Sequence, residues 1–426
     1  MLGFDEAATQ LGRVARSVVL MIGVVAILFA GANFVAKLFL PTPSRPNDVL
    51  AAVDWPGSAA SKELYRRVFK LSANDDPLAR FNASPPLVMH PTLPFATQRI
   101  ENRYFRVGLE GIRYEPGWSD EDVGALLVGP RPLIFAFGGS TTFGHGLAAD
   151  ETWPHALNVI LGANAGPGSP ATRPVVINFG AQAYDQRTEI DKLIYLLRRG
   201  YRPSKVVMLD GWNDLFIARS NMRAVDRVVY HGFAQGRGEI AFTPGSSINR
   251  PSYLHLLLEY SPLQQLIRHW QGAPRRIEDV KFNRDAFVDG FDFREADYAF
   301  RHWALFGEHH RERYKREIVE YYRTNLTLLK ALAEAYGFVF HVFYQPIGLL
   351  DDTNPFVSTR APRAPGYRYI SELVASVREA ISNGDIQMID TSNALTDMPG
   401  PRYLDVAHYS PEANAMLARA IAKHTQ

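Results

Sequence analysis

The sequence contains no cysteine among its 426 residues. This absence excludes disulfide bonds, thiolate metal sites and a cysteine nucleophile. Any covalent catalysis must therefore use serine, threonine, lysine or a carboxylate. The absence does not decide the compartment, because a chain without cysteine suits either side of a membrane.

The chain also lacks an excess of charge of either sign: 46 lysine and arginine residues face 44 aspartate and glutamate residues, for a formal net charge of +2. A nucleic-acid partner is disfavoured, because such partners require a strong positive field. No set of histidine, aspartate and glutamate residues has metal-ligand spacing, so we expect neither a metal nor another cofactor. The 46% hydrophobic and 21% charged residues are ordinary for a folded protein.

Residues 17–36 contain no charged side chain. At about 1.5 Å rise per residue, a helix of roughly 20 residues spans a hydrocarbon core of about 30 Å. We therefore predict a short tail at 1–16 and one transmembrane helix at 17–36. The alternative is a cleaved signal peptide, because Arg13 and Arg16 precede the apolar run and Ala30–Ala32 resembles a small-residue cleavage site.

The basic residues that flank the apolar run do not decide its orientation. We place the tail in the cytoplasm and the large C-terminal part outside it. The protein is then a single-pass inner-membrane protein with a periplasmic domain, or a secreted protein if the run is a cleaved signal peptide.

Residues 37–87 are predicted to connect the membrane span to the folded domain. Pro41–Leu50 is rich in proline and polar residues, which is typical of a semi-rigid spacer. A short helix is expected near Ser61–Leu71. The main domain is predicted over 88–426.

From Pro132 onward, short apolar runs alternate with segments of helical periodicity, which is typical of a parallel sheet covered on both faces. The predicted strands are 132–137, 175–178, 205–210, 338–344 and 386–390. The fold class is therefore α/β with a five-stranded parallel sheet. A helix at 314–336 is predicted to stop at Gly337. Residues 215–298 form a long aromatic and basic insertion with a helix near 253–270, which we expect to act as a lid or side wall.

In an open parallel sheet, ligands bind beyond the carboxyl ends of the strands, so the residues leaving each strand are the first candidates for a site. The first strand ends in Gly138, Gly139 and Ser140. Glycine permits a sharp turn and a close approach of the backbone. Ser140 would lie at the mouth of the sheet as a nucleophile, with its backbone N–H toward an oxyanion. On its own, this pattern is more typical of a serine helix cap.

Two neighbouring strand ends offer further hydrogen-bond donors. Gly180 follows the second strand and can present a backbone N–H, and Asn213 follows the third and can present its side-chain amide. With the N–H of Ser140, these donors would form an oxyanion hole. Taken singly, Gly180 is more typical of a turn and Asn213 of a loop, and we expect Asp210 and Asp214 to form turns.

The last predicted strand is followed by the sequence Asp-Val-Ala-His at 405–408, just before a helix predicted to begin at Pro411. The three-residue step lets one turn bring the carboxylate of Asp405 to Nδ1 of His408. Nε2 of His408 is then free to accept the proton of Ser140. In isolation, this short pattern is weak.

The other histidines are less suited to act as the base. His145 follows Ser140 on the same outgoing turn, where short-range geometry is awkward for a base, and we expect it on a helix face or at the rim of the site. His309 and His310 lie in a charged helical run and are expected in solvent. His341 is expected to pack within the fourth strand.

With these segments in order, the chain resembles the SGNH hydrolase superfamily, which is named for the Ser, Gly, Asn and His of its four blocks. The resemblance covers about Pro132–His424, and the matching segments are GGST with Ser140, INFGAQAY with Gly180, GWND with Asn213, and DVAH with Asp405 and His408. The first block departs from the GDSL pattern, with Gly139 where aspartate is usual and Thr141 where leucine is usual. Residues 104–116 also resemble the lead-in of membrane-anchored members.

The resemblance implies a flavodoxin-like, three-layer α/β/α domain that attacks an ester carbonyl without a cofactor. We therefore predict an extracytoplasmic serine esterase that removes O-acyl groups, such as acetyl, from a cell-surface glycan or lipid through an acyl-Ser140 intermediate. Two alternatives stay open: an O-acyltransferase that passes the acyl group to a sugar, and a non-catalytic assembly subunit that keeps the fold. Trp270, Tyr298, Phe300 and Trp303 could stack on sugar rings, although such spacing is more typical of a core.

Overall fold

The computed structural model describes residues 59–72, 74–88, 90–164, 173–215, 303, 307–357, 361–363 and 365–425. All of these residues belong to one compact unit of the chain. The predicted membrane span at 17–36 lies outside the described residues, as does the predicted insertion at 215–298 apart from Leu215. Within the described part of the chain, no helix combines the length and the apolar character that crossing a membrane requires.

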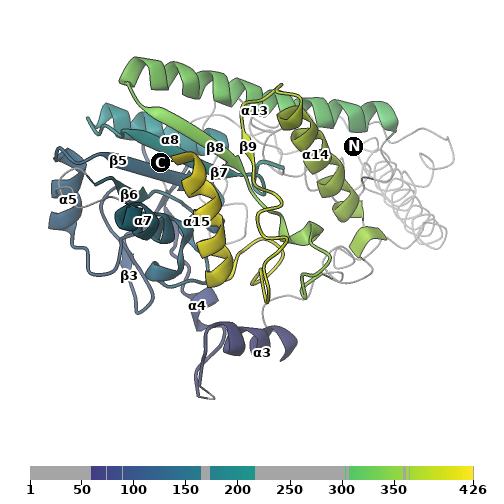
Figure 1. Ribbon diagram of the computed structural model, residues 1–426, viewed down its shortest axis with the longest axis horizontal. Coiled ribbons are helices and arrows are strands. Elements are labelled where there is room, and N and C mark those ends of the chain that lie inside the picture. Colours follow the sequence, from purple (N-terminus) through teal and green to yellow (C-terminus); the bar gives the residue numbers. More distant parts are fainter. Residues whose placement is uncertain are drawn as a thin grey trace, which may run out of the picture. The chain divides into compact units, whose positions relative to one another are not determined.

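From residue 120 onward, strands are separated by helices along the described chain (Figure 1). The helices are α3 (Ala59–Val68), α4 (Ala79–Asn82), α5 (Asp120–Val128), α6 (Ser140–Phe143), α7 (Trp153–Asn164), α8 (Gln186–Arg198), α13 (Glu308–Tyr336), α14 (Pro365–Ser382) and α15 (Pro411–Thr425). The strands are β1 (Leu87–Val88), β2 (Ala96–Thr97), β3 (Ile100–Glu101), β4 (Arg106–Val107), β5 (Leu133–Gly138), β6 (Val175–Asn178), β7 (Lys205–Asp210), β8 (Val339–Tyr344) and β9 (Ile389–Asp390).

Strands β5 to β9 form one parallel sheet in the order β6-β5-β7-β8-β9. This is the order of flavodoxin-like doubly wound sheets, and it confirms the predicted α/β fold with five parallel strands. Every residue of β5 and β6 is buried, because both faces of the sheet are covered. The fifth strand is shorter than the predicted 386–390, since β9 is at the edge and pairs with β8 only at Ile389 and Asp390.

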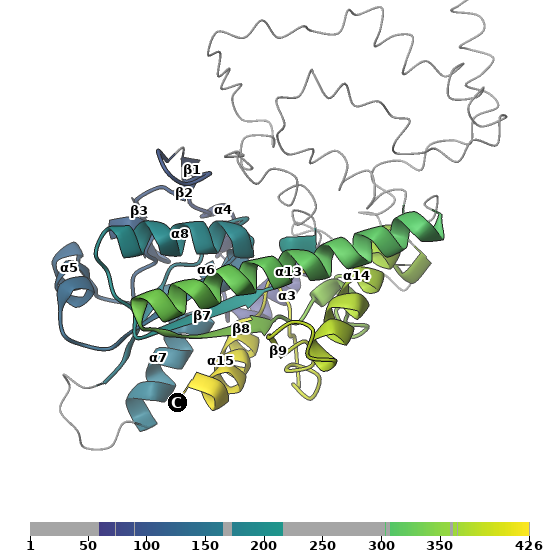
Figure 2. The same ribbon diagram turned by 90° about the horizontal axis from the view of Figure 1, so that it is seen from above.

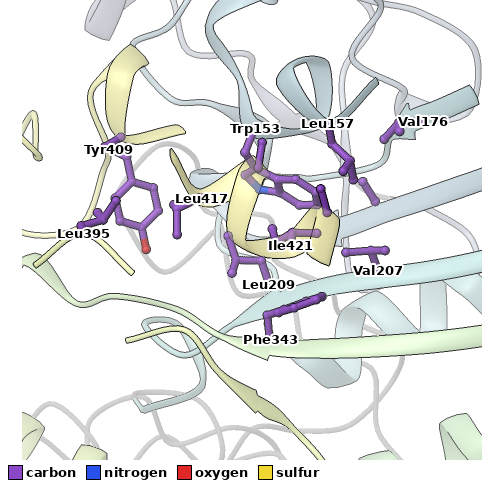
Figure 3. Packing of buried hydrophobic residues seen from close by; sticks show 14 of the residues in the cluster. Trp153, Leu157, Val176, Val207, Leu209, Phe343, Leu395, Tyr409, Leu417 and Ile421 are labelled. Atoms are coloured by element: carbon purple, nitrogen blue, oxygen red, sulfur yellow. The ribbon is translucent and has the colours of Figure 1, made fainter. Parts of the chain in front are cut away.

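The sheet lies between two layers of helices. Figure 2 shows α8 and α13 on one side of the strands and α7 and α15 on the other. A buried apolar cluster lies between the sheet and helices α7 and α15. In it, Trp153, Leu157, Leu417 and Ile421 pack against Val207 and its neighbours on the strands (Figure 3). Burial of these side chains fixes the helices on the sheet and holds the strand ends in register.

Helix α13 ends as predicted at Gly337, which has a left-handed φ of 74°. It begins at Glu308, earlier than the predicted 314. His309 is exposed near its start, and His341 is half-buried in β8.

Trp303 is fully buried, with ring centroids 5.5 Å from Tyr314 and 5.1 Å from Tyr369, so it packs in the core instead of facing a sugar. The other three aromatic residues considered for stacking lie outside the described residues.

The N-terminal segment differs from the prediction, which placed the start of the domain at 88 and treated 37–87 as a connection. The described part of that range packs against the rest of the domain. Leu64, Tyr65 and Phe69 of the first helical segment join a buried cluster with Phe81 and Leu404. The physical reason is the hydrophobic effect, because these side chains would expose large apolar surfaces to water if the segment were a free spacer.

Candidate active site

Ser140 is the first residue of the four-residue helix α6, directly after β5. The turn between them requires two glycines. A Cβ on Gly138, which has a φ of 151°, would lie 1.9 Å from Oγ1 of Thr142. A Cβ on Gly139 would lie 2.2 Å from Nδ2 of Asn213. Only glycine at both positions lets the backbone bring Ser140 this close to its neighbours at the end of the sheet.

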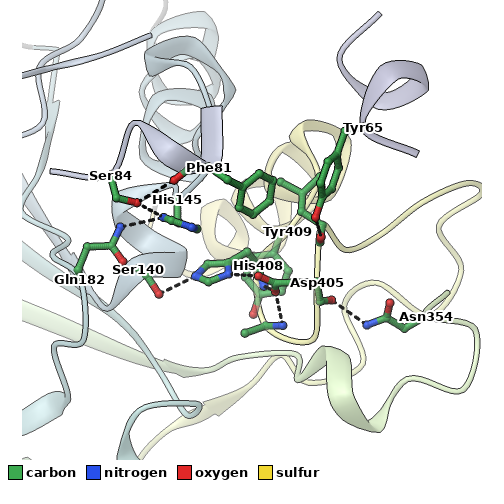
Figure 4. A network of polar contacts seen from close by, with 12 residues as sticks. Tyr65, Phe81, Ser84, Ser140, His145, Gln182, Asn354, Asp405, His408 and Tyr409 are labelled. Atoms are coloured by element: carbon green, nitrogen blue, oxygen red, sulfur yellow. Dashed lines mark hydrogen bonds and ion pairs between the residues drawn. The ribbon is translucent and has the colours of Figure 1, made fainter. Parts of the chain in front are cut away.

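Ser140, His408 and Asp405 form one hydrogen-bonded line (Figure 4). Nε2 of His408 is 2.8 Å from Oγ of Ser140, and Nδ1 of His408 is 2.6 Å from Oδ2 of Asp405. A carboxylate can only accept, so the ring proton is on Nδ1 and Nε2 accepts the proton of the serine. The structure thus brings together three residues from distant parts of the chain, in the geometry that withdraws a proton from a serine nucleophile.

The charge of Asp405 is stabilised by its neighbours. Burial alone would raise the pKa of its carboxyl, but the positive charge on a protonated His408 and the hydrogen bonds to the carboxylate lower the pKa to about 2. Oδ1 accepts the backbone N–H groups of Ala407 and His408, each at 2.7 Å. Asp405 therefore stays ionised and holds the imidazole in one orientation.

The loop that carries Asp405 and His408 is braced from two sides. Nδ2 of Asn354 donates to the carbonyl oxygen of Asp405 at 2.9 Å. The hydroxyl of Tyr65, on α3, donates to the carbonyl oxygen of Leu404 at 2.6 Å. Both contacts are to backbone atoms, so they fix the path of the loop and with it the position of the imidazole.

Of the three predicted oxyanion donors, Ser140 and Asn213 line the same small cavity, which measures about 10 Å³. Nδ2 of Asn213 donates one hydrogen to the carbonyl oxygen of Tyr184 at 2.6 Å. The amide carries a second hydrogen that this bond does not use. The N–H of Ser140 has no acceptor within its helix, because Ser140 is the first residue of α6.

Gly180 is placed differently. Its N–H donates to Oδ1 of Asn178 at 2.9 Å, so it is already engaged, and Gly180 does not line the cavity beside Ser140. A Cβ at this position would lie 2.3 Å from the backbone nitrogen of Phe143. In this structure, Gly180 serves the close packing of its loop against the helix that carries Ser140.

Buried acids support the loop that carries Asn213. Asp214 accepts the N–H of Gly211 at 2.8 Å, as expected for a turn-forming residue, and also the N–H of Gln186 at 3.0 Å. Burial, and then the charge of a neighbouring aspartate, raise the pKa of Asp214 to about 6. Burial, followed by the charge of Asp210, also raises the pKa of Glu189 well above its usual value. Asp214 thus holds the loop, and it and Glu189 are acids that retain protons more readily than exposed ones.

Sequence reasoning missed Arg113, which holds the other end of the nucleophile helix. The side chain is 2% exposed. Its guanidinium donates to the carbonyl oxygens of Phe143, Gly144 and Leu147 at 2.7, 2.8 and 2.6 Å. Burial lowers the pKa of Arg113 to about 9, although nearby carboxylates oppose the shift. Residues 104–116 contain two arginines, Arg106 and Arg113, and nothing in the sequence distinguishes them, because the acceptors of Arg113 are backbone atoms that no sequence pattern marks.

The sequence predicted only that His145 would lie on a helix face or at the rim of the site. The structure puts its ring beside that of His408, with 4.6 Å between the centroids. Its partners are Ser84 and Gln182 (Figure 4). Among the described residues, no group of three or more histidine, aspartate or glutamate side chains is arranged to hold a metal ion.

No protein-family model and no curated protein matches the chain. Among solved structures, it is similar to a lipolytic protein of the G-D-S-L family from Veillonella parvula, with 10% identity and a TM-score of 0.33 over 68% of this chain and 96% of that one. It is also similar to an α/β hydrolase from the metagenome of Lake Arreo, with 12% identity and a TM-score of 0.34 over 69% and 94%. A carbohydrate acetylesterase family member from Sinorhizobium meliloti shares 14% identity, with a TM-score of 0.30 over 69% and 97%.

Proposed function

We propose that this protein is a serine esterase that removes small O-acyl groups from alcohols through an acyl-Ser140 intermediate. The observation that carries this proposal is the continuous line of hydrogen bonds from Ser140 through His408 to Asp405. A buried serine without such partners would be a weak nucleophile.

The geometry supports a two-step reaction. Oγ of Ser140 attacks the ester carbonyl carbon while Nε2 of His408 takes the serine proton. The tetrahedral intermediate carries its negative charge on the former carbonyl oxygen, toward the N–H of Ser140 and the amide of Asn213. When the intermediate collapses, the bond to the alcohol breaks and His408 returns the proton to the leaving oxygen. Water, activated by the same histidine, then attacks the acyl-enzyme and releases the carboxylic acid and Ser140.

The cavity beside Ser140 favours a small acyl group. Its volume of about 10 Å³ is roughly the room that the centre of a single water molecule needs. A methyl group is close to water in size, so an acetyl ester suits this cavity better than a long acyl chain. The residues that line the cavity include Thr141, Tyr184 and Gln345.

We further propose that the enzyme works outside the cytoplasm, as a single-pass protein of the inner membrane, on an acylated glycan or lipid of the cell surface. The uncharged run at 17–36 supports this location. Fusion of a topology reporter to the C-terminus would test it, because a reporter that is active only in the cytoplasm should stay silent.

The activity is tested with the full-length protein and an O-acetylated sugar, with released acetate as the product measured. Ser140→Ala should abolish release and prevent labelling by a fluorophosphonate, because both need the serine oxygen. Ser371→Ala removes a hydroxyl that bonds, among the described residues, to its own helix α14; it is the matched control and should behave as wild type. Labelling and acetate release that persist in Ser140→Ala would refute the proposal.

Two other results would change the function assigned. Wild-type protein that transfers acetyl to a sugar acceptor faster than to water would show an acyltransferase. Wild-type protein that neither releases acetate nor accepts the fluorophosphonate would favour a non-catalytic subunit that keeps the fold.

A further inference from the structure

The turn that leaves α6 carries a second imidazole into the site. The ring of His145 lies 4.6 Å from that of His408, centroid to centroid, with 45° between the planes. The backbone N–H of His145 donates to the carbonyl oxygen of Ser140 at 3.0 Å. Gly144 and Gly146 on either side have φ values of 83° and 76°, which favour glycine. The same short segment therefore fixes both the nucleophile and His145.

One nitrogen of His145 is engaged by the protein. Nδ1 lies 2.8 Å from Oγ of Ser84 and 3.2 Å from Nε2 of Gln182, and Figure 4 shows these contacts on one side of the ring. An amide nitrogen can only donate, so in this amide orientation Nδ1 accepts and the proton of the neutral ring is on Nε2. Burial, and then the charge of His408, lower the pKa of His145 to about 3. The ring is therefore neutral near pH 7.

The other nitrogen is available to a ligand. Among the described residues, none forms a hydrogen bond with Nε2 of His145. Nε2 is also not one of the fully buried nitrogen atoms that lack a partner, so its N–H can be reached from outside. The ring of His145 also packs against that of Phe81, with 5.2 Å between centroids and 79° between the planes. His145 is only partly buried, so a firmly held donor lies beside His408.

The reaction decides which part of a substrate meets this donor. His408 returns its proton to the leaving alcohol, so the oxygen of that alcohol must lie beside Nε2 of His408. A donor in ring contact with His408 is therefore on the side of the leaving alcohol, away from the acyl group. An oxygen on the carbon next to the leaving oxygen would lie within reach of this donor.

We propose that Nε2–H of His145 donates a hydrogen bond to an oxygen on the carbon adjacent to the leaving oxygen, so that His145 selects esters of sugars and other polyols over esters of simple alcohols. This inference rests on the proposed esterase function and adds the residue that recognises the alcohol. His145 is then a specificity-determining residue, while His408 alone moves the proton.

The test compares two acetate esters of similar size with the full-length protein. One is a methyl xyloside that carries a single acetyl group, and the other is cyclohexyl acetate, whose ring has no oxygen next to the ester. Released acetate gives kcat/KM for each ester, and the ratio of the two values is the quantity compared. Fluorophosphonate labelling of Ser140, measured in each variant, reports whether the nucleophile is still assembled.

His145→Phe keeps an aromatic ring but removes the donor. The kcat/KM for the sugar ester divided by that for cyclohexyl acetate should therefore fall about tenfold, the order expected for one hydrogen bond. His145→Gln keeps an N–H near the position of Nε2 and should hold the ratio within about threefold of wild type. His341→Phe changes a half-buried histidine within β8 and is the matched control. If His145→Phe fails to fold, His145→Leu replaces it as the variant without a donor.

The outcomes separate the inference from the proposed function. A wild-type ratio in His145→Phe would overturn the role of His145 and leave the esterase proposal standing. An equal loss of ratio in the Phe and Gln variants would also overturn it, because the donor would not be the feature that matters. Wild-type protein that releases acetate from neither ester would remove the proposed function, and the role of His145 with it.

Discussion

Replacing Asp405 with asparagine should inactivate the protein through the orientation of one amide. Oδ1 of Asp405 accepts two backbone N–H groups, and Oδ2 accepts Nδ1–H of His408. Asparagine has a single acceptor oxygen. If that oxygen keeps the two backbone bonds, its NH₂ group faces His408 and forces the ring proton onto Nε2, where it blocks transfer from Ser140.

The size of the effect follows from counting these bonds. The productive amide orientation gives up both backbone bonds, which costs about 2–3 kcal/mol at roughly 1–1.5 kcal/mol per bond. At about 1.4 kcal/mol per factor of ten, only about one molecule in 30 to one in 150 is productive. Loss of the carboxylate charge, which strengthens its bond to a protonated His408, costs about another tenfold. We expect kcat/KM of Asp405→Asn to fall between about 300-fold and about 1,500-fold.

The assay is acetate release from an acetylated sugar at pH 7, with denaturant unfolding as a check on stability. Because the backbone bonds survive in the favoured orientation, Asp405→Asn should unfold within about 1 kcal/mol of wild type. Asp405→Ala loses those bonds and should be less stable. Activity of Asp405→Asn within tenfold of wild type would refute the reasoning, since the amide would then be shown not to control the tautomer.

Three further predictions follow from buried contacts. Arg113→Met strips three carbonyl oxygens of their donor and should lower the free energy of unfolding by about 3–5 kcal/mol in a denaturant titration; a loss below about 1 kcal/mol would contradict this. Gly139→Ala should push Asn213 away and lower kcat about 100-fold in the acetate assay, whereas Gly162→Ala, with open space around it, should not. The raised pKa of Glu189 means that wild type loses stability as pH rises through that pKa, because the unfolded chain gives up the proton more easily. Glu189→Gln, measured at pH 5 and pH 9, should lose less stability than wild type over this interval, and equal losses would disprove the assignment.

The sheet and the hydrogen-bonded residues Ser140, His408 and Asp405 could be predicted from the sequence, because short sequence patterns mark each of them. Continuous apolar runs mark β5, β6 and β7, which are buried on both faces. Ser140 directly follows β5, so it must lie at the carboxyl edge of the sheet. His408 follows β9 only after a longer segment, and its meeting with Ser140 was expected from the Asp-Val-Ala-His pattern and from the resemblance.

The remaining features depend on contacts between distant segments. Nothing near His145 in the sequence indicates that Ser84 and Gln182 would fix its tautomer. Gly180 was expected to offer a free N–H, but the side chain of Asn178 accepts it. The start of the domain was placed too late because the sequence of 59–87 indicates only one short helix and no apolar strand, while the aromatic contacts that bind this segment to the domain appear only in three dimensions.

The hydrogen bond from Tyr65 to Leu404 has a practical consequence for preparing the protein. A fragment that starts at the first strand of the sheet would lack the hydroxyl that braces the loop before Asp405, and also Ser84, which holds His145. Truncations intended to remove the apolar N-terminus should therefore begin ahead of Ala59, because a shorter chain would keep all three triad residues and still lose part of what aligns them.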